Sequence, residues 1–244
     1  MSTVAAVVLT LNEQRHISDC VSSVRWADRV IVLDTLSTDD TVDLARAAGA
    51  EVMQHAFENY AQIRNVALDL VEATWLFFVD ADERATPQLA DEVRQVTNYR
   101  PENGWWVPRH NIIFGRLTRG AGWYPDHQMR LLRRGHAHYQ RPVHEIVALD
   151  GAAGFLANPL LHYNYDNVAQ FRAKQSRYTQ FGARILHAEG VRARWYTPFT
   201  QAIRHFGWRY WTLAGYREGG HGLRLCLLMA WYEAAKYHQL RRIR

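Results

Sequence analysis

The chain has 244 residues, of which 48% are hydrophobic, and its 29 Lys and Arg against 24 Asp and Glu give a formal net charge of +5. This composition excludes a disordered chain and allows one large core with a small appendage. Cys20 and Cys226 are the only cysteines, which excludes a disulfide framework and a four-ligand zinc site and favours a reducing cytosol.

Four apolar segments in the first eighty residues predict buried β-strands. They read TVAAVVLT (3–10), RVIVLD (29–34), AEVMQHA (50–56) and WLFFV (75–79). Each is followed by apolar residues at helical spacing, and the pair Thr86–Pro87 predicts the start of the fourth helix. Strand and helix therefore alternate four times, which predicts an α/β fold with a Rossmann-like, mostly parallel sheet covered by helices on both faces.

Polar residues gather where these strands end. Asn12 and Glu13 follow the first strand, Asp34 ends the second, and Asp80 and Asp82 follow the fourth. In doubly wound sheets ligands bind outside the carboxyl ends of the strands. Side chains two residues apart on an extended segment point the same way, and two carboxylates about 4–5 Å apart repel by roughly 3–4 kcal/mol at an effective dielectric near 20. A divalent cation would remove that repulsion, so the pattern favours a metal site.

A simpler interpretation stays open at this point. Asp82, Glu83 and Thr86 are also the residues that would cap and charge the following helix. The chain carries no glycine-rich phosphate-binding loop, so a diphosphate would depend on metal and arginine. Arg64, in AQIRNVAL, is the candidate arginine.

The second half of the chain has a different character. From residue 103 short strand-like pieces are broken by glycines, which predicts an antiparallel edge that completes the same domain. Residues 167–190 show helical spacing of apolar side chains. We therefore expect a catalytic domain at 1–165 and a helical extension at 166–244.

The ordered motifs resemble a known family. They are VVLTLNEQRHI, IVLDTLSTDDTV, AQIRNVAL, FFVDADERATP, GWYPDHQMRLLRRG, RPVHEIV and LLHYNY. Together they resemble family 2 glycosyltransferases of the GT-A fold, and within that family the bacterial group that includes the lipopolysaccharide inner-core β-glucosyltransferases. The resemblance covers residues 4 to 165 and continues weakly into the helical extension.

The resemblance implies a role for individual residues. It implies that Asp34 contacts the nucleotide base, that Asp80 contacts the ribose, and that Asp82 and His144 ligate Mn²⁺ or Mg²⁺. It also implies that Asp126, in WYPDHQ, is the catalytic base that takes the proton of the acceptor hydroxyl.

Further assignments are less sharply defined. Glu145 is the rival base, or a partner that orients His144. Trp123, Tyr124 and Arg130 flank Asp126 and are expected to shape the acceptor site. Asn12, Glu13 and Arg64 complete the expected nucleotide-sugar site.

One departure concerns the loop after the second strand. The family usually has D-S-G-S-T-D there, whereas this chain has DTLSTDD. Thr35 and Leu36 therefore replace a serine and a glycine, and the backbone shape of the loop is an open question.

The C-terminal segment is basic and aromatic. Residues 192–244 contain 10 Arg and Lys against 2 Glu, and 11 of these 53 residues are Trp, Tyr or Phe. This pattern predicts interfacial helices on an anionic bilayer. A dimer interface, or a helix packed on the catalytic domain, are the alternatives, and nucleic acid is not an expected partner.

Taken together, the sequence predicts a metal-dependent inverting glycosyltransferase that moves a sugar, expected to be glucose, from a UDP-sugar to a lipid-linked saccharide such as lipopolysaccharide core. Without a signal-peptide pattern or a membrane-spanning run, we expect it in the cytoplasm, peripheral on the inner face of the cell membrane. The alternatives are a nucleotidyltransferase making nucleotide sugars and a non-catalytic saccharide-binding module. The first would normally have a glycine-rich loop where this chain has LNEQRH.

Overall fold

The computed structural model describes residues 2–141 and 146–243, and the chain forms two compact units. The first contains Met1–Arg109 and Asp126–His162, and the second contains His110–Pro125 and Tyr163–Arg244. The domains expected at 1–165 and 166–244 follow chain order. In the structure the segment 110–125 instead groups with the later residues.

The first unit is a sheet with helices. Its helices are α1 (Ile17–Ser23), α2 (Thr41–Ala47), α3 (Tyr60–Leu70) and α4 (Pro87–Tyr99). Its strands are β1 (Val4–Thr10), β2 (Arg29–Asp34), β3 (Glu51–Gln54), β4 (Trp75–Asp80), β5 (Glu83–Ala85), β8 (His127–Arg133), β9 (Ala137–Gln140), β10 (Ile146–Leu149) and β11 (Ala153–Phe155). Strands β6 (Gly104–Ile113) and β12 (Leu160–Tyr165) begin in this unit and end in the second.

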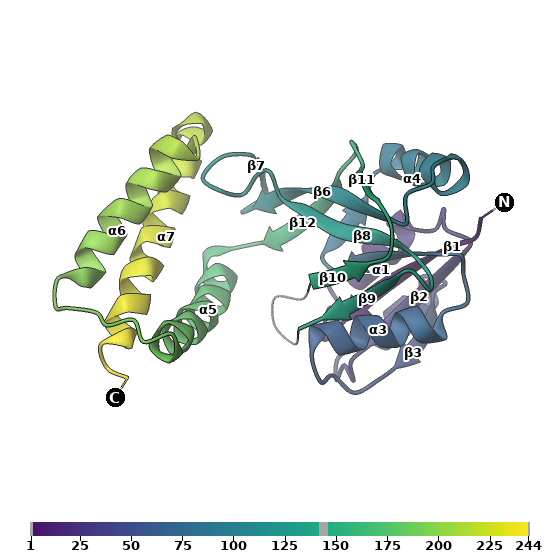
Figure 1. Cartoon of the computed structure of the whole chain (residues 1–244), viewed down its shortest axis with the longest axis horizontal. Coiled ribbons are helices and arrows are strands. Elements are labelled where there is room, and N and C mark those ends of the chain that lie inside the picture. The colour runs from purple at the N-terminus through teal and green to yellow at the C-terminus, as the bar shows by residue number, and fades with distance from the viewer. Residues whose placement is uncertain (1, 142–145, 244) are drawn as a thin grey trace. The chain divides into compact units, whose positions relative to one another are not determined.

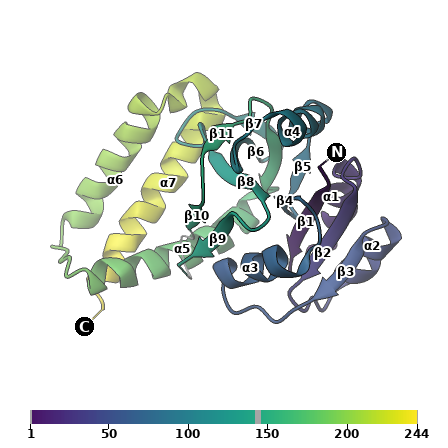
Figure 2. The ribbon, with the colours of Figure 1, turned by 45° about the vertical axis from the view of Figure 1, so that its right-hand side comes forward.

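The sheet has a parallel half and an antiparallel half. Strands β3, β2, β1 and β4 are parallel neighbours in that order, and they lie side by side in Figure 2. Beyond β4 the order continues β8, β6, β12, β5, with β8 antiparallel to both β4 and β6. The predicted α/β fold is confirmed, and so is the antiparallel completion after residue 103.

The continuous apolar runs of β1 and β4 are explained by helices on both faces of the sheet (Figure 1). Val8 and Phe77 belong to the apolar core that contains Ile17 of α1 and Leu89 of α4. Their neighbours Val7 and Phe78 point the other way, into a second core with Ile63 of α3. This alternation fixes the register, so the carboxyl ends of β1, β2 and β4 meet at one edge.

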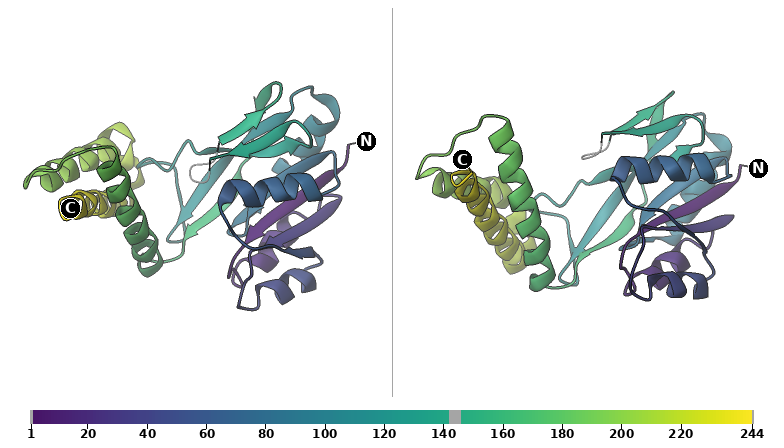
Figure 3. Two further views of the ribbon diagram at one scale, coloured as in Figure 1. Left: turned by 60° about the horizontal axis from the view of Figure 1, so that its bottom comes forward. Right: turned by 90° about the horizontal axis from the view of Figure 1, so that it is seen from below.

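The second unit is mainly helical. It contains β7 (Arg116–Thr118), α5 (Val168–Ala188), α6 (Thr197–Gly207), a π-helical turn at Trp208–Thr212, a 3₁₀ turn at Gly215–Glu218, and α7 (Gly219–Leu240). Helix α7 packs against both α5 and α6, as the green and yellow helices of Figure 3 show. A small core of Ile113, Tyr165, Phe171 and Leu225 holds the unit together. Among the described residues, we find no helix with the length and apolar character needed to cross a bilayer.

Candidate active site

Asp80, the last residue of β4, is held by two buried arginines. Its Oδ1 accepts hydrogen bonds from Arg64 of α3 and Arg130 of β8, both at 3.2 Å, and Arg130 also donates to Oδ2. The arginine side chains are 6% and 5% exposed. Burial opposes ionisation of Asp80, but the positive charges of Arg130 and Arg64 outweigh burial and hold the pKa of this carboxyl well below its usual range.

Glu83 ties this pair to a third arginine. Its side chain is 0% exposed and accepts hydrogen bonds from the Asp80 backbone N–H at 2.9 Å, from Arg130 at 3.0 Å and from Arg109 at 3.3 Å. The sequence suggested that Glu83 caps the next helix, but the structure places it inside an ion-pair cluster. A buried carboxylate between two guanidiniums is satisfied by both charge and hydrogen bonds.

Asp126 lies at the far end of the same cluster. Its Oδ2 is 2.9 Å from Nε and 2.8 Å from Nη2 of Arg109, and its Oδ1 accepts a hydrogen bond from Gln128 at 3.0 Å. The Arg109 backbone N–H also donates to the Asp126 carbonyl at 2.6 Å. Arg109, Glu83 and Arg130 therefore connect Asp126 to Asp80, and the cluster contains three carboxylates and three guanidiniums.

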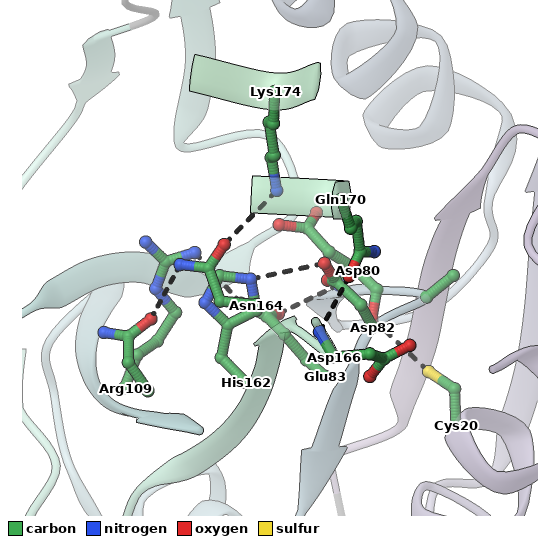
Figure 4. A network of polar contacts seen from close by, with 12 residues as sticks. Cys20, Asp80, Asp82, Glu83, Arg109, His162, Asn164, Asp166, Gln170 and Lys174 are labelled. Atoms are coloured by element: carbon green, nitrogen blue, oxygen red, sulfur yellow. Dashed lines mark hydrogen bonds and ion pairs between the residues drawn. The ribbon is translucent and has the colours of Figure 1, made fainter. Parts of the chain in front are cut away.

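Asp82 has a different partner from Asp80. It follows β4 in the turn before β5, and its Oδ2 lies 3.3 Å from Nε2 of His162 on β12. The two side chains are 21% and 8% exposed. Figure 4 shows this pair beside Asp80 and Glu83. Arginines already balance the charge of Asp80, so the two carboxylates have different partners, and a cation shared by Asp80 and Asp82 stays a prediction.

The pair Asp82–His162 fits a divalent cation. Two ligands at right angles on an octahedral ion with bonds of about 2.1 Å lie about 3 Å apart, close to the separation observed. The carboxylate oxygen suits both Mn²⁺ and Mg²⁺, whereas the imidazole nitrogen suits a transition metal such as Mn²⁺ better than Mg²⁺. Within residues 2–141 and 146–243 no cluster of three or more potential ligands occurs, and the predicted ligand His144 lies outside these residues.

Asn12 and Asp34 shape the loop after β2. Asp34 is 0% exposed and accepts hydrogen bonds from Gln54, at 3.0 Å, and from Ser37. The Asn12 side chain accepts from the Thr38 N–H at 2.8 Å. The structure thus answers the question about the loop: Leu36 adopts φ +68°, the left-handed conformation that a glycine would adopt without strain.

Glu13 is connected to the same loop through its backbone. Its N–H donates to Oγ1 of Thr41, at the start of α2, at 2.8 Å, and its carbonyl accepts from His16 and Ile17 at the start of α1. Glu13 thereby joins the two helices that follow β1 and β2.

Other predicted site residues fall elsewhere. His144 and Glu145 lie outside the described residues. Trp123 and Tyr124 belong to the second unit, where Trp123 packs edge-on against Tyr165 and Tyr124 is exposed. Arg130, expected near the acceptor, is instead a buried counter-charge for Asp80 and Glu83.

A cavity adjoins the ion-pair cluster. It has a volume of about 420 Å³, and Arg64, Arg130 and Tyr139 line it together with Trp106, Gln128, Met129, Ile146 and Val147. The Arg64 guanidinium lies 5.5 Å from the centre of the Tyr139 ring. A volume of this size falls within the range of small-molecule sites.

Sequence reasoning missed three residues of this site. Glu83 and His162 stand in the motifs FFVDADERATP and LLHYNY quoted above. The motifs alone did not reveal the role of either residue. Arg109 carried no signal, because its partner Asp126 lies 17 residues away across the β6–β8 pairing.

Comparison with known proteins gives the family to which the sequence is similar. A family model described as "Glycosyl transferase family 2" matches residues 5–137. The lipopolysaccharide core biosynthesis glycosyltransferase LpsC of Rhizobium meliloti (strain 1021) is 27% identical over 96% of this chain and 92% of its own length. An uncharacterized glycosyltransferase of Rickettsia bellii (strain RML369-C) is 34% identical over 77% of this chain and 68% of its own.

Solved structures share the fold. Glucosyl-3-phosphoglycerate synthase from Mycobacterium tuberculosis, in complex with phosphoglyceric acid, has a TM-score of 0.51 at 18% identity over 78% of this chain and 81% of its own. TarS 1-349 of S. aureus has a TM-score of 0.50 at 13% identity over 97% of this chain and 91% of its own. At such identities the likeness concerns the fold alone.

Proposed function

Because this chain belongs to glycosyltransferase family 2, we propose that it moves glucose from UDP-glucose to a lipid-linked saccharide of the lipopolysaccharide core type, inverting the anomeric carbon. Its similarity to LpsC along nearly the whole chain supports this acceptor class. The observation that carries the mechanism is the ion-pair cluster that links Asp126 to Asp80 through Arg109, Glu83 and Arg130.

The donor would bind at the carboxyl ends of β1, β2 and β4. Asp80 would accept a ribose hydroxyl while Arg64 and Arg130 keep it ionised. Asp34 is fully buried, so its part in base recognition would run through the 35–38 loop that it and Asn12 hold in place. Glu13 would support this side by joining α1 to α2.

The metal site would consist of Asp82 and His162, with His144 as a further predicted ligand. A bound Mn²⁺ or Mg²⁺ supplies Lewis-acid stabilisation of the negative charge on the departing diphosphate. Asp82 and His162 would fix the position of that charge next to the donor-binding Asp80.

Asp126 would act as general base. As the acceptor oxygen forms its bond to the anomeric carbon, the bond to the diphosphate oxygen breaks and UDP leaves with the bonding electrons. The acceptor proton passes to the Asp126 carboxylate. Arg109 and Gln128 orient this carboxylate from two sides, and an oriented base reduces the entropy cost of the transition state.

Fewer contacts describe the proposed acceptor site than the proposed donor site. Trp123 and Tyr124 remain predicted acceptor residues, whereas the burial of Arg130 favours a part in holding Asp80. A lipid-linked acceptor requires the enzyme to work at a membrane surface, which we propose is the cytoplasmic face of the cell membrane.

The test is product formation from the donor. With UDP-glucose and Mn²⁺ but no acceptor, a glycosyltransferase releases UDP slowly by hydrolysis, and a lipid-linked core saccharide should accelerate the release strongly. Formation of UTP upon addition of pyrophosphate would instead indicate a nucleotidyltransferase, and neither product would indicate a binding module. Loss of metal-stimulated UDP release in Asp82→Ala would assign the activity to this site.

A further inference from the structure

Helix α6 and the turns beside it expose a row of large apolar side chains. Trp195, Phe199, Ile203 and Trp211 are 71%, 67%, 74% and 66% exposed. We call these four residues the α6 apolar row. Exposed aromatic and aliphatic side chains scattered singly are ordinary on a protein surface, but a contiguous row indicates a binding surface.

The row follows from helix geometry. Phe199 and Ile203 are four residues apart in α6, a spacing that keeps side chains on one face of a helix, and Trp195 stands in the turn just before α6. In an α-helix each such step drifts by about 40°, because one turn takes 3.6 residues. The π-helical turn at Trp208–Thr212 is wider and offsets this drift, so Trp211 stays near the same face.

The row is not required to hold the unit together. Helix α6 packs against α7, and within the same segment Phe206 stacks on Tyr210 with ring centres 5.3 Å apart. The core of the unit consists of Ile113, Tyr165, Phe171 and Leu225, none of which belongs to the row. The row therefore lies outside the core of the unit and leaves most of its apolar surface exposed.

The C-terminal segment that carries the row, residues 192–244, has a basic surplus. The surface of the same segment exposes a set of arginines: Arg192, Arg194, Arg204, Arg217, Arg224, Arg241 and Arg242. The two acidic residues of the segment are engaged internally. Glu218 accepts the backbone N–H groups of Arg119 and Gly120, each at 2.9 Å, and Glu233 pairs with Lys236 at 2.9 Å. The basic surplus is thus presented to solvent.

We propose that the α6 apolar row docks the protein on an anionic bilayer, with its rings among the lipid headgroups and the arginines on lipid phosphates. Tryptophan and arginine are the side chains that favour this interface. A second copy of the chain fits less well, since a two-fold contact would bring two basic surfaces together. The inference deepens the location proposed above, but vesicle binding needs neither donor nor acceptor, so it stands or falls separately from sugar transfer.

The test is binding of the full chain to vesicles. Cosedimentation with vesicles containing phosphatidylglycerol is compared with pure phosphatidylcholine, for the wild type, Phe199→Ser/Ile203→Ser and the control Tyr99→Ser, which alters an aromatic side chain 81% exposed in the first unit. We expect the wild type and the control to bind the anionic vesicles and the double variant to lose about tenfold or more in partitioning. Tryptophan fluorescence of the wild type should shift to shorter wavelength on binding.

Two controls keep the result interpretable. Arg204→Glu should weaken binding most at low salt, because exposed charges are screened as ionic strength rises. Circular dichroism checks that each variant is folded. Equal binding to both vesicle types, unchanged binding of the double variant, or a dimer that the double variant dissociates while vesicles bind nothing would each overturn the proposal.

Discussion

The two units place their side chains in opposite ways. In the first, three carboxylates and three guanidiniums lie together at 32% exposure or less. In the second, Trp195, Trp208, Trp211 and Trp231 are 47% to 71% exposed. Burying charge and exposing indole rings both cost stability relative to the reverse arrangement. The comparison teaches that each unit departs from the most stable packing where it is proposed to meet another molecule, a nucleotide sugar in one case and a bilayer in the other.

The largest effect should come from the metal pair in the first unit. Asp82→Ala and His162→Ala should each weaken metal-dependent UDP binding by at least about 100-fold, since even residues outside the ligand set change metal affinity by 10–100-fold. Isothermal titration calorimetry with and without Mn²⁺ measures this. His136→Ala alters an exposed His–Asp pair, His136–Asp150 at 3.3 Å, and should leave the titration unchanged. Wild-type affinity in His162→Ala would remove that residue from the site.

The buried ion-pair cluster should also contribute strongly to the free energy of unfolding. Glu83→Gln leaves Arg109 and Arg130 without their shared carboxylate, and breaking a buried pair in this way costs about 3–5 kcal/mol. Urea unfolding measures the loss. Glu51→Gln breaks an exposed pair with Arg29 (2.7 Å, side chains 40% and 56% exposed) and should cost less than about 1 kcal/mol. Equal losses in the two variants would mean that the cluster is no tighter than a surface ion pair.

The second unit contains a partly buried histidine, His205, whose protonation should make stability depend on pH. His205 accepts a hydrogen bond from Arg209 at 3.3 Å, and burial together with the charge of Arg209 lowers the pKa of His205 from 6.5 to about 4. The unfolded chain therefore takes up this proton before the folded chain does, and stability is lost as pH falls from about 6.5 to about 4.

Replacement of that imidazole should remove part of the pH dependence. Between pH 7.5 and pH 5 the melting temperature of His205→Gln should fall less than that of the wild type, by about 2–4 °C for each kcal/mol involved. Tryptophan fluorescence is suited to this measurement, since five of the nine tryptophans belong to the second unit. Identical pH dependence in both proteins would show that His205 is not held neutral.

The smallest effect concerns the loop after β2. Leu36→Gly should raise stability by about 0.5–1 kcal/mol, because Leu36 sits at φ +68° and left-handed backbone costs a leucine about 1–2 kcal/mol. Leu11 is similarly exposed, 51% against 53%, but lacks a positive φ, so Leu11→Gly should lower stability. The comparison is made by urea unfolding, and a lower stability of Leu36→Gly would refute the strain.

The sequence predicted the parallel half of the fold because its signals are local. Apolar runs such as 75–79 indicate a strand that is buried on both faces. Asp80 and Asp82 come at the end of that strand, so the sequence places them at the edge where the parallel strands end. The antiparallel half depends on pairings between distant segments. Nothing in the sequence around Arg109 indicates that β6 and β8 bring it to Asp126.

The same limit applies to the proposed metal ligands. His144 stands in RPVHEIV and His162 in LLHYNY. Both segments are apolar and strand-like, so the local sequence pattern does not show which histidine lies near Asp82. The pairing of β12 with β5 places His162 opposite Glu83 and so beside Asp82. The sequence showed that the C-terminal segment is basic and aromatic. The helix face that carries the α6 apolar row could be identified only once the helix boundaries were known.

The central claim is that Asp126 removes the acceptor proton within a cluster that also serves the donor site. The most direct measurement is the turnover of Asp126→Asn set beside its affinity for UDP-glucose. We expect normal donor affinity with turnover reduced by about 10²–10⁴-fold. Asp126→Asn with most of its activity retained, alongside an inactive Glu145→Gln, would contradict it and assign the base to Glu145.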